Sequence, residues 1–233
     1  IQVLFHKSFD LVDMIVTNNK LYNVRKDFNS IDLNREITIN NKKIGPNNKC
    51  FIIAEAGINH NGNFEIAKKL ILEAKKSGCD AIKFQSFLPE SRVSKKVKSE
   101  RYVEKVIDTE ESINQLFTKV ALKFDEQKKL FNFAKKHKML MFSTPFDFES
   151  ANFLDELGVD VFKIASMDLA NIPLVEHVAK KMKPVIISTG MSKLYEIDET
   201  VEAFKGTGNP NLIILHCNSS YPSSNEELNL KLI

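Results

Sequence analysis

Six short runs of apolar residues recur along the chain, and stretches with helical periodicity separate them. The runs have the length of strands, are rich in β-branched residues or Phe, and begin near Cys50, Asp80, Met139, Asp160, Pro184 and Asn211. Residues 64–76 place apolar side chains on one face and Lys and Glu on the other, as an amphipathic helix does. Residues 125–136, 150–157, 173–181 and 197–204 continue this pattern. Strands that alternate with helices imply βαβ crossovers and a parallel sheet.

The boundaries of these expected helices carry suitable residues. Asp125 is placed to cap the second main helix, and Pro173 suits a first helical turn, where its missing N–H would be unpaired anyway. Gly78, Gly158 and Gly208 stand where helices should end and a left-handed residue is favoured. Ahead of the first strand, residues 37–43 alternate apolar and polar around an Asn-Asn pair, which predicts a small hairpin.

This order of elements predicts an α/β protein. We expect a (β/α)8 TIM barrel that is incomplete, with strands one to six present and the small hairpin in front. Residues 50–233 are fewer than the ~250 of a typical barrel, so the remaining two strands should lie beyond Ile233. An open doubly wound sheet is the rival fold and needs no missing parts. Against it, the segment AEAGINHNG after the first strand is not the GxGxxG phosphate-binding fingerprint.

Three regions of the chain are distinguished by composition. Residues 1–36 fit none of the pattern, and we expect them to be the tail of an upstream segment or a linker without an assigned function. Residues 37–233 form the partial barrel domain, and both ends of the chain look cut. Within it, residues 91–111 are charged and irregular. A loop of this length after a barrel strand is usually a lid or substrate loop, and a solvated helix is the equal alternative.

Composition excludes several classes of protein. A formal charge of +3 on 233 residues, spread along the chain, argues against a dedicated nucleic-acid surface. No apolar run reaches the ~18 residues of a membrane span. Cys50, Cys79 and Cys217 form no CxxC pair and read as reduced thiols, and no signal peptide is present, so we expect a cytoplasmic protein.

Polar residues follow each predicted strand, at the end where a parallel barrel carries its chemistry. Lys83 and Lys163 end two different strands, and hydroxyl groups follow the others. Together they would form a cradle for a phosphate or a phospho-carboxylate. Glu55 interrupts an apolar run, where an unpaired carboxylate is costly to bury, so it is a candidate base or stabiliser of a developing cation.

Each of these residues also has a purely structural interpretation. A single lysine at a strand end is commonly a solvated surface residue, and only the repetition over several strands favours a site. His60 and His216 are candidate metal ligands, but hydrogen-bonded structural roles are at least as common for a lone histidine.

Six motifs carry a resemblance to a known family. They are FIIAEAGINHNG (51–62), DAIKFQSF (80–87), FSTPFD (142–147), FKIASMDLANIPL (162–174), KPVIISTGMS (183–192) and ILHCNSSYP (214–222). At these residues the chain resembles the sialic acid synthase family, the bacterial N-acetylneuraminate and legionaminate synthases. The resemblance runs from about residue 37 to residue 233, with all six motifs in order.

The resemblance implies a reaction. Members condense phosphoenolpyruvate with an N-acyl-hexosamine, such as N-acetylmannosamine, to a nine-carbon 2-keto sugar acid of the sialic or legionaminic type, and release phosphate. They are TIM barrels with a C-terminal antifreeze-like domain, and they act as homodimers. A divalent metal, Mn or Mg, polarises the aldehyde. Its ligands would lie beyond Ile233, so no metal ligand is assigned here, and the fragment should be inactive alone.

The resemblance also implies roles for individual residues. Glu55 would be catalytic. Phosphoenolpyruvate would be bound by Lys83, Thr144, Lys163, Ser166, Ser188 and Ser219. The sugar would be bound by Gln85, Asp168 and Tyr221. Some neuraminate synthases have Glu where this chain has Asp168, which leaves the sugar open.

Two rival functions remain. One is another phosphoenolpyruvate-dependent barrel synthase that makes ketodeoxy sugar acids from aldose phosphates, although no second cluster of Arg or Lys follows the strands. The other is a non-catalytic protein derived from such a barrel and used in surface polysaccharide assembly.

Overall fold

All six predicted barrel strands form. The computed structural model describes residues 2–4, 14–17, 20–23, 31–92, 113–220 and 222–232. The predicted strands are β6 (Phe51–Gly57), β7 (Ala81–Ser86), β8 (Leu140–Pro145), β9 (Phe162–Ile164), β10 (Val185–Ser188) and β11 (Leu212–Leu215). Most of residues 91–111 lie outside the described residues, as does Tyr221.

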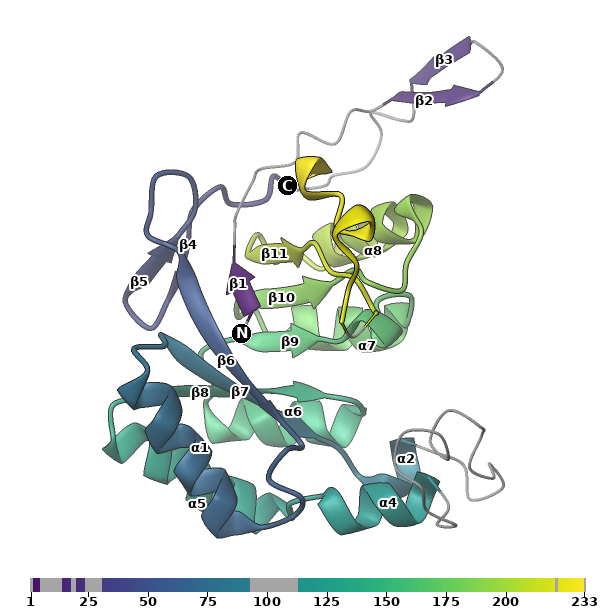
Figure 1. The fold of residues 1–233 in the computed structure, drawn as a ribbon. Coiled ribbons are helices and arrows are strands. Elements are labelled where there is room, and N and C mark those ends of the chain that lie inside the picture. Colours follow the sequence, from purple (N-terminus) through teal and green to yellow (C-terminus); the bar gives the residue numbers. More distant parts are fainter. Residues whose placement is uncertain are drawn as a thin grey trace.

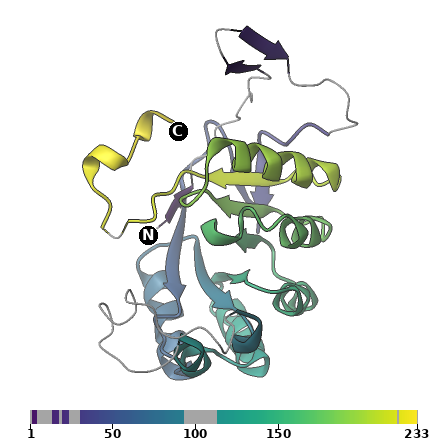
Figure 2. The same ribbon diagram turned by 90° about the vertical axis from the view of Figure 1, so that its right-hand side faces the viewer.

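Helices follow the strands and cover one face of the sheets (Figures 1 and 2). They are α1 (Phe64–Lys76), α2 (Pro89–Arg92), α4 (Ile113–Val120), α5 (Phe124–Lys136), α6 (Phe148–Leu157), α7 (Ile172–Ala179) and α8 (Leu194–Gly206). The 3-10 turns are η1 (Ser166–Asp168), η2 (Asn225–Glu227) and η3 (Leu230–Leu232). The observed order confirms an α/β fold built from strand–helix repeats.

The predicted helix boundaries are mostly right. Pro173 lies in the first turn of α7, and Gly78, Gly158 and Gly208 adopt left-handed φ angles of +76°, +77° and +84° after their helices. The prediction that Asp125 caps α5 is wrong. The helix begins one residue earlier, and the carboxylate that accepts the free Lys123 backbone N–H is that of Glu126, at 3.0 Å. A carboxylate in the third helical position reaches back to the cap more readily than one in the second.

The strands form two parallel groups rather than one continuous ladder. One sheet has the order β1-β6-β7-β8 and the other β11-β10-β9, and β8 lies beside β9 without a hydrogen-bonded pairing. β1 (Gln2–Leu4) pairs antiparallel with β6 (Figure 1). The first barrel strand is therefore not an unpaired edge, because an earlier segment of the chain pairs with it. Among the described strands β11 remains an edge.

Two hairpins precede the first barrel strand. β2 (Met14–Thr17) pairs with β3 (Lys20–Asn23), and β4 (Ile37–Ile39) pairs with β5 (Lys42–Ile44). The second is the predicted hairpin, and its turn residues Asn40 and Asn41 have φ angles of 45° and 64°, as a two-residue hairpin turn requires. Its isoleucines are buried with residues from five of the barrel strands and with Val161, which directly precedes β9. The hairpin thus covers the amino ends of the strands, which leaves the carboxyl ends for chemistry.

Side chains alternate between two cores along each strand. Ala81 belongs to the cluster that gathers the barrel strands and the hairpin, whereas Ile82 and Phe84 join the cluster under α1 and α5. On β9, Val161 just before the strand faces inward and Phe162 faces the helices. This two-residue period separates an inner face from an outer, helix-covered face.

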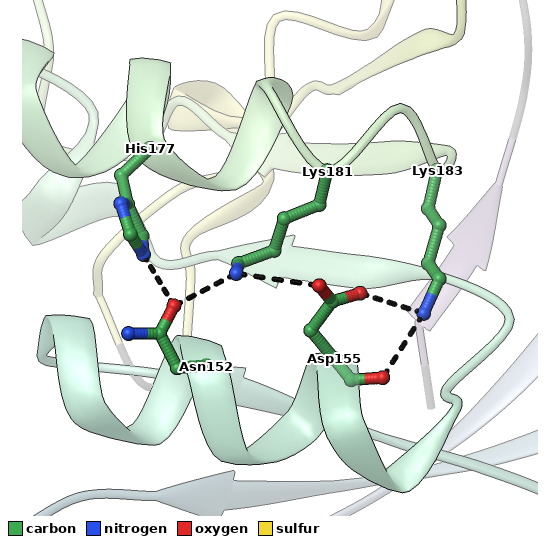
Figure 3. Close-up of polar contacts among 5 residues, drawn as sticks. All are labelled: Asn152, Asp155, His177, Lys181 and Lys183. Carbon is green, nitrogen blue, oxygen red and sulfur yellow. Dashed lines mark hydrogen bonds and ion pairs between the residues drawn. The ribbon is translucent and has the colours of Figure 1, made fainter.

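A polar network joins α6 to α7 and to the segment before β10 (Figure 3). Asp155 faces Lys183 at 2.8 Å and Lys181 at 3.5 Å. Lys181 also donates to Asn152 Oδ1 at 2.8 Å, and His177 Nε2 lies 2.7 Å from the same oxygen. We call these five residues the outer cluster. Each of them has a hydrogen-bond or ion-pair partner within the cluster.

Candidate active site at the carboxyl ends of the strands

The inner face of each strand changes from apolar to polar toward its carboxyl end. On β7, Ala81 lies in the inner core, and the next inward positions are Lys83 and Gln85. The same two-residue steps lead from Ile53 to Glu55, from Phe142 to Thr144, from Val161 to Lys163 and from Ile186 to Ser188. Polar groups of five strands therefore share one layer above the apolar core.

Lys83 joins three strands in this layer. It is paired in register with Glu55, and its Nζ lies 2.9 Å from Glu55 Oε2. The same Nζ donates to Thr144 Oγ1 at 3.1 Å. Since Lys83 is only 5% exposed, its charge is held inside the site rather than extended into solvent. The interpretation of Lys83 as a solvated surface lysine is therefore wrong.

Lys163 is the second buried cation. Its Nζ donates to Ser188 Oγ at 2.5 Å and to the Ile164 carbonyl at 2.6 Å, and the residue is 2% exposed. Burial, followed by the positive charge of Lys83, lowers its pKa to about 7, while Glu55 and Asp168 act in the opposite direction. The positive charges of the two ammonium groups thus repel each other within one site. A bound anion would offset this repulsion.

The loops after β9, β10 and β11 meet at Gly190. Its backbone N–H donates to Ser166 Oγ at 3.0 Å, and a Cβ at this position would lie 2.8 Å from Ser219 Oγ. A side chain at residue 190 would therefore displace Ser219. The structure thus places Ser166 and Ser219 on either side of one glycine.

Two acceptor atoms in the site lack a partner among the described residues. They are Oε1 of Glu55 and Oδ2 of Asp168, whereas Glu55 Oε2 has the ion pair with Lys83. Burial raises the pKa of Asp168, and the hydrogen bond from Asn171 and the charge of Arg92 oppose this. Leaving such acceptors unsatisfied costs roughly 1–3 kcal/mol each. Hydrogen-bond donors of a bound ligand would remove that cost.

Arg92 is a residue of the site that sequence reasoning missed. Its guanidinium donates to Gln85 Oε1 at 3.2 Å, and it lies over the rings of Phe87, Phe117 and Phe146. Burial lowers its pKa to about 10, and the charge of Asp168 opposes this shift, so Arg92 remains charged. The only signal in the sequence is its place seven residues after Gln85, directly beyond the second strand.

The two candidate histidines have structural partners. His60 is 2% exposed, its Nδ1 accepts the Gly62 backbone N–H at 3.1 Å, and burial lowers its pKa, so it is a neutral ring. His216 Nε2 lies 2.7 Å from the Leu228 carbonyl. Within the described part of the chain, no group of three or more His, Cys, Asp or Glu side chains is placed to hold a metal ion. The metal that the resemblance implies, with ligands beyond Ile233, therefore stays a prediction.

A separate hollow of about 310 Å³ lies at the opposite, amino ends of β6 and β7. Its lining is the hairpin and strand-start residues Lys42, Lys43, Asn48, Lys49, Cys50, Phe51 and Asp80. Lys42 and Asp80 form an ion pair, so two of the charged groups in this lining already have a partner. Because parallel α/β proteins carry their chemistry at the carboxyl ends, the layer around Lys83 and Lys163 is the better candidate.

Comparison with known proteins places the chain in a family. Residues 70–233 match the NeuB family. The chain belongs to the NeuB family. A relative from Campylobacter jejuni, N,N'-diacetyllegionaminic acid synthase, is 43% identical over 185 residues, which cover 78% of this chain and 55% of that protein. The NeuB chain thus spans about half the length of the curated relatives it matches.

Solved structures support the same assignment. The N-acetylneuraminic acid synthetase of Leptospira borgpetersenii, in complex with citrate, superposes with a TM-score of 0.74 at 37% identity, over 87% of this chain and 66% of that one. A truncated 3-deoxy-D-arabino-heptulosonate 7-phosphate synthase from Thermotoga maritima shares the fold alone, with a TM-score of 0.56 at 15% identity over 78% of this chain and 56% of that one. No described helix of the NeuB chain has the length and apolar character needed to cross a membrane.

Proposed function

We propose that the protein condenses phosphoenolpyruvate with an N-acyl-hexosamine of the N-acetylmannosamine type. The product is a nine-carbon 2-keto sugar acid, and phosphate is released. The observation that carries this proposal is the layer in which two buried lysines, Lys83 and Lys163, stand near the Glu55 carboxylate, whose Oε1 has no hydrogen-bond donor among the described residues. The names of the legionaminic and N-acetylneuraminic acid relatives point to the same chemistry.

In the proposed reaction, the lysines bind the anionic substrate. Lys83 and Lys163, with Thr144, Ser166, Ser188 and Ser219, would hold the phosphate and carboxylate of phosphoenolpyruvate. In the empty site the positive charge of Lys83 disfavours the charged form of Lys163. An anion bound between the two ammonium groups stabilises the charge of both. Binding therefore keeps the charge of Lys163 at neutral pH.

Glu55 would act at the reacting carbons. Carbon 3 of the enol attacks the aldehyde carbon of the open-chain sugar. The new C–C bond forms as the π bond of the aldehyde breaks toward its oxygen, which takes a proton from solvent to become a hydroxyl, and positive charge is left at carbon 2. Glu55 Oε1 has no hydrogen-bond donor among the described residues, so the carboxylate can stabilise that charge or take the proton of the water that adds to carbon 2. Collapse of the resulting intermediate breaks the C–O bond and releases phosphate.

Other features of the whole protein are part of the same proposal. We expect the six described barrel strands to belong to a complete (β/α)8 barrel. We expect that protein to act as a homodimer in the cytoplasm with Mn or Mg as its metal. The described residues gather no group of three metal-ligating side chains, so no step is assigned to that ion. Gln85, Asp168 and Tyr221 would bind the sugar.

The direct test is substrate choice by the complete gene product. Phosphate release should require phosphoenolpyruvate together with N-acetylmannosamine or a related N-acyl-hexosamine, and arabinose 5-phosphate should not replace the sugar. Turnover with the phosphosugar alone would instead support a ketodeoxy sugar acid synthase. Absence of phosphate release with every sugar, from a folded protein, would support a non-catalytic role.

A further inference from the structure

Arg92 is the residue of the site with the most unusual surroundings. The guanidinium carbon lies 3.7 Å from the ring centre of Phe146, 4.2 Å from that of Phe117 and 4.6 Å from that of Phe87. These rings come from the residue directly after β7, from α4 and from the loop after β8. Contact with aromatic faces holds a planar guanidinium in place, so the direction of its N–H groups is set by tertiary packing.

This fixed guanidinium determines how the amide of Gln85 is oriented. The guanidinium has N–H donors and no acceptor, so the amide atom 3.2 Å from it must be the oxygen Oε1. A glutamine amide could otherwise present either end to the site. Since Arg92 takes the oxygen, the NH2 group of Gln85 is the end left for a ligand.

That NH2 group lies close to Gly57 and to the carboxylate of Glu55. A Cβ built on Gly57 would lie 3.6 Å from Gln85 Nε2 and 3.2 Å from Glu55 Oε1. Glu55 Oε1 has no hydrogen-bond donor among the described residues. A donor, Gln85 Nε2, and an acceptor, Glu55 Oε1, therefore both lie beside Gly57.

We propose that Arg92 is a positioning residue that orients the Gln85 amide, so that Gln85 Nε2 and Glu55 Oε1 together select a sugar hydroxyl or acyl-amide group that both accepts and donates a hydrogen bond. This inference rests on the proposed function and adds the residue that decides sugar recognition. A hydroxyl meets both requirements, because it accepts from Gln85 and donates to Glu55. A substrate without such a group would leave both protein atoms unpaired and be rejected.

The test is a set of variants of the complete gene product, with the KM values for N-acetylmannosamine and phosphoenolpyruvate measured separately by phosphate release. Arg92→Met keeps an apolar stem among the three rings but removes the donor. It should raise the KM for the sugar roughly tenfold, which is what one lost hydrogen bond costs, and leave the KM for phosphoenolpyruvate unchanged. Arg92→Lys keeps a charged donor and should raise the sugar KM less than about threefold.

Gln85→Glu provides the independent variant. Its carboxylate still pairs with Arg92 but offers no donor beside Gly57, so the sugar KM should rise at least as much as in Arg92→Met. A wild-type sugar KM in Gln85→Glu overturns the inference even where Arg92→Met does not fold. An equal rise of both KM values in Arg92→Met also overturns it, since that is the result of a general structural defect. If the wild-type protein itself turns over no N-acyl-hexosamine, the proposed function fails instead.

Discussion

In the described part of the chain, two clusters combine a pair of lysines with a carboxylate, and they differ in how completely their polar groups are paired with one another. In the outer cluster, Asp155 faces Lys183 and Lys181, and Asn152 accepts a further hydrogen bond from Lys181 (Figure 3). Partial burial acts to raise the pKa of Asp155, but the hydrogen bond and charge of Lys183, with the charge of Lys181, outweigh it and lower the pKa. The outer cluster is complete without a ligand.

The cluster at the strand ends is not complete. Glu55 Oε2 has the ion pair with Lys83, and Oε1 has no hydrogen-bond donor among the described residues. Lys163 has neutral hydrogen-bond partners, Ser188 and a carbonyl, and its pKa falls to about 7 because of burial and the charge of Lys83. The comparison teaches that lysines and a carboxylate stabilise the fold where other side chains of the protein pair with them. The same residue types create a binding site where some of their charges and acceptor atoms have no partner in the protein.

The largest expected effect is on phosphate release, which should depend on the strand-end cluster and not on the outer cluster. Lys163→Met should lower phosphate release at least about 100-fold, because a preorganised charge that faces the substrate is lost. Its free energy of unfolding should stay within about 1 kcal/mol of wild type, since removing a buried cation also removes its desolvation cost. Steady-state kinetics and urea unfolding of the complete gene product measure both quantities.

Lys183→Met is the matched control for that variant. It removes a lysine from the outer cluster, so phosphate release should remain at the wild-type rate while stability falls slightly. Wild-type turnover in Lys163→Met would end the assignment of the strand-end cluster as the active site. Loss of turnover in a folded Lys183→Met would erase the proposed difference between the clusters.

The next effect concerns pH and sharpens the comparison through Lys163. In the free protein Lys163 is protonated below its pKa of about 7 and neutral above it. A bound anion favours the charged form and raises that pKa. The KM for phosphoenolpyruvate should therefore rise above pH 7, by up to about tenfold per pH unit, until the pKa of the complex is reached. A profile that stays flat from pH 7 to pH 9 would contradict a role for Lys163 in binding the anion.

The smallest expected effect tests the outer cluster. Asp155→Asn breaks two partly exposed ion pairs and should lower the free energy of unfolding by at most about 1 kcal/mol, less at high salt. The folded pKa of Asp155 lies below its ordinary value of 3.8, so this stability is present above that value and is lost as the pH falls through the folded pKa. Thermal unfolding of wild type and variant at several pH values should show the two curves converging in acid. A difference that persists in acid would mean that Asp155 acts through something other than its charge.

Local patterns predicted the elements because each depends on neighbours in sequence. The helix at Phe64–Lys76 and the hairpin turn at Asn40 and Asn41 follow from periodicity and turn chemistry alone. Asp125 was wrongly predicted as a cap because several polar residues near a helix start can compete for one N–H, and here Glu126 accepts it. The pairing of β1 with β6 joins segments about fifty residues apart, which no local pattern encodes.

By itself, the sequence determined which residues end the strands, and the two-residue period determined that Lys83, Lys163 and Glu55 face inward. Only the tertiary structure decided what those groups meet. Burial and the repulsion between two lysines lower the pKa of Lys163, and that requires strands far apart in the chain to share one layer. The role of Arg92 depends on three rings brought together from the residue directly after β7, from α4 and from the loop after β8. Side-chain direction is a local property of backbone geometry, whereas charge, burial and partners arise from contacts between distant segments.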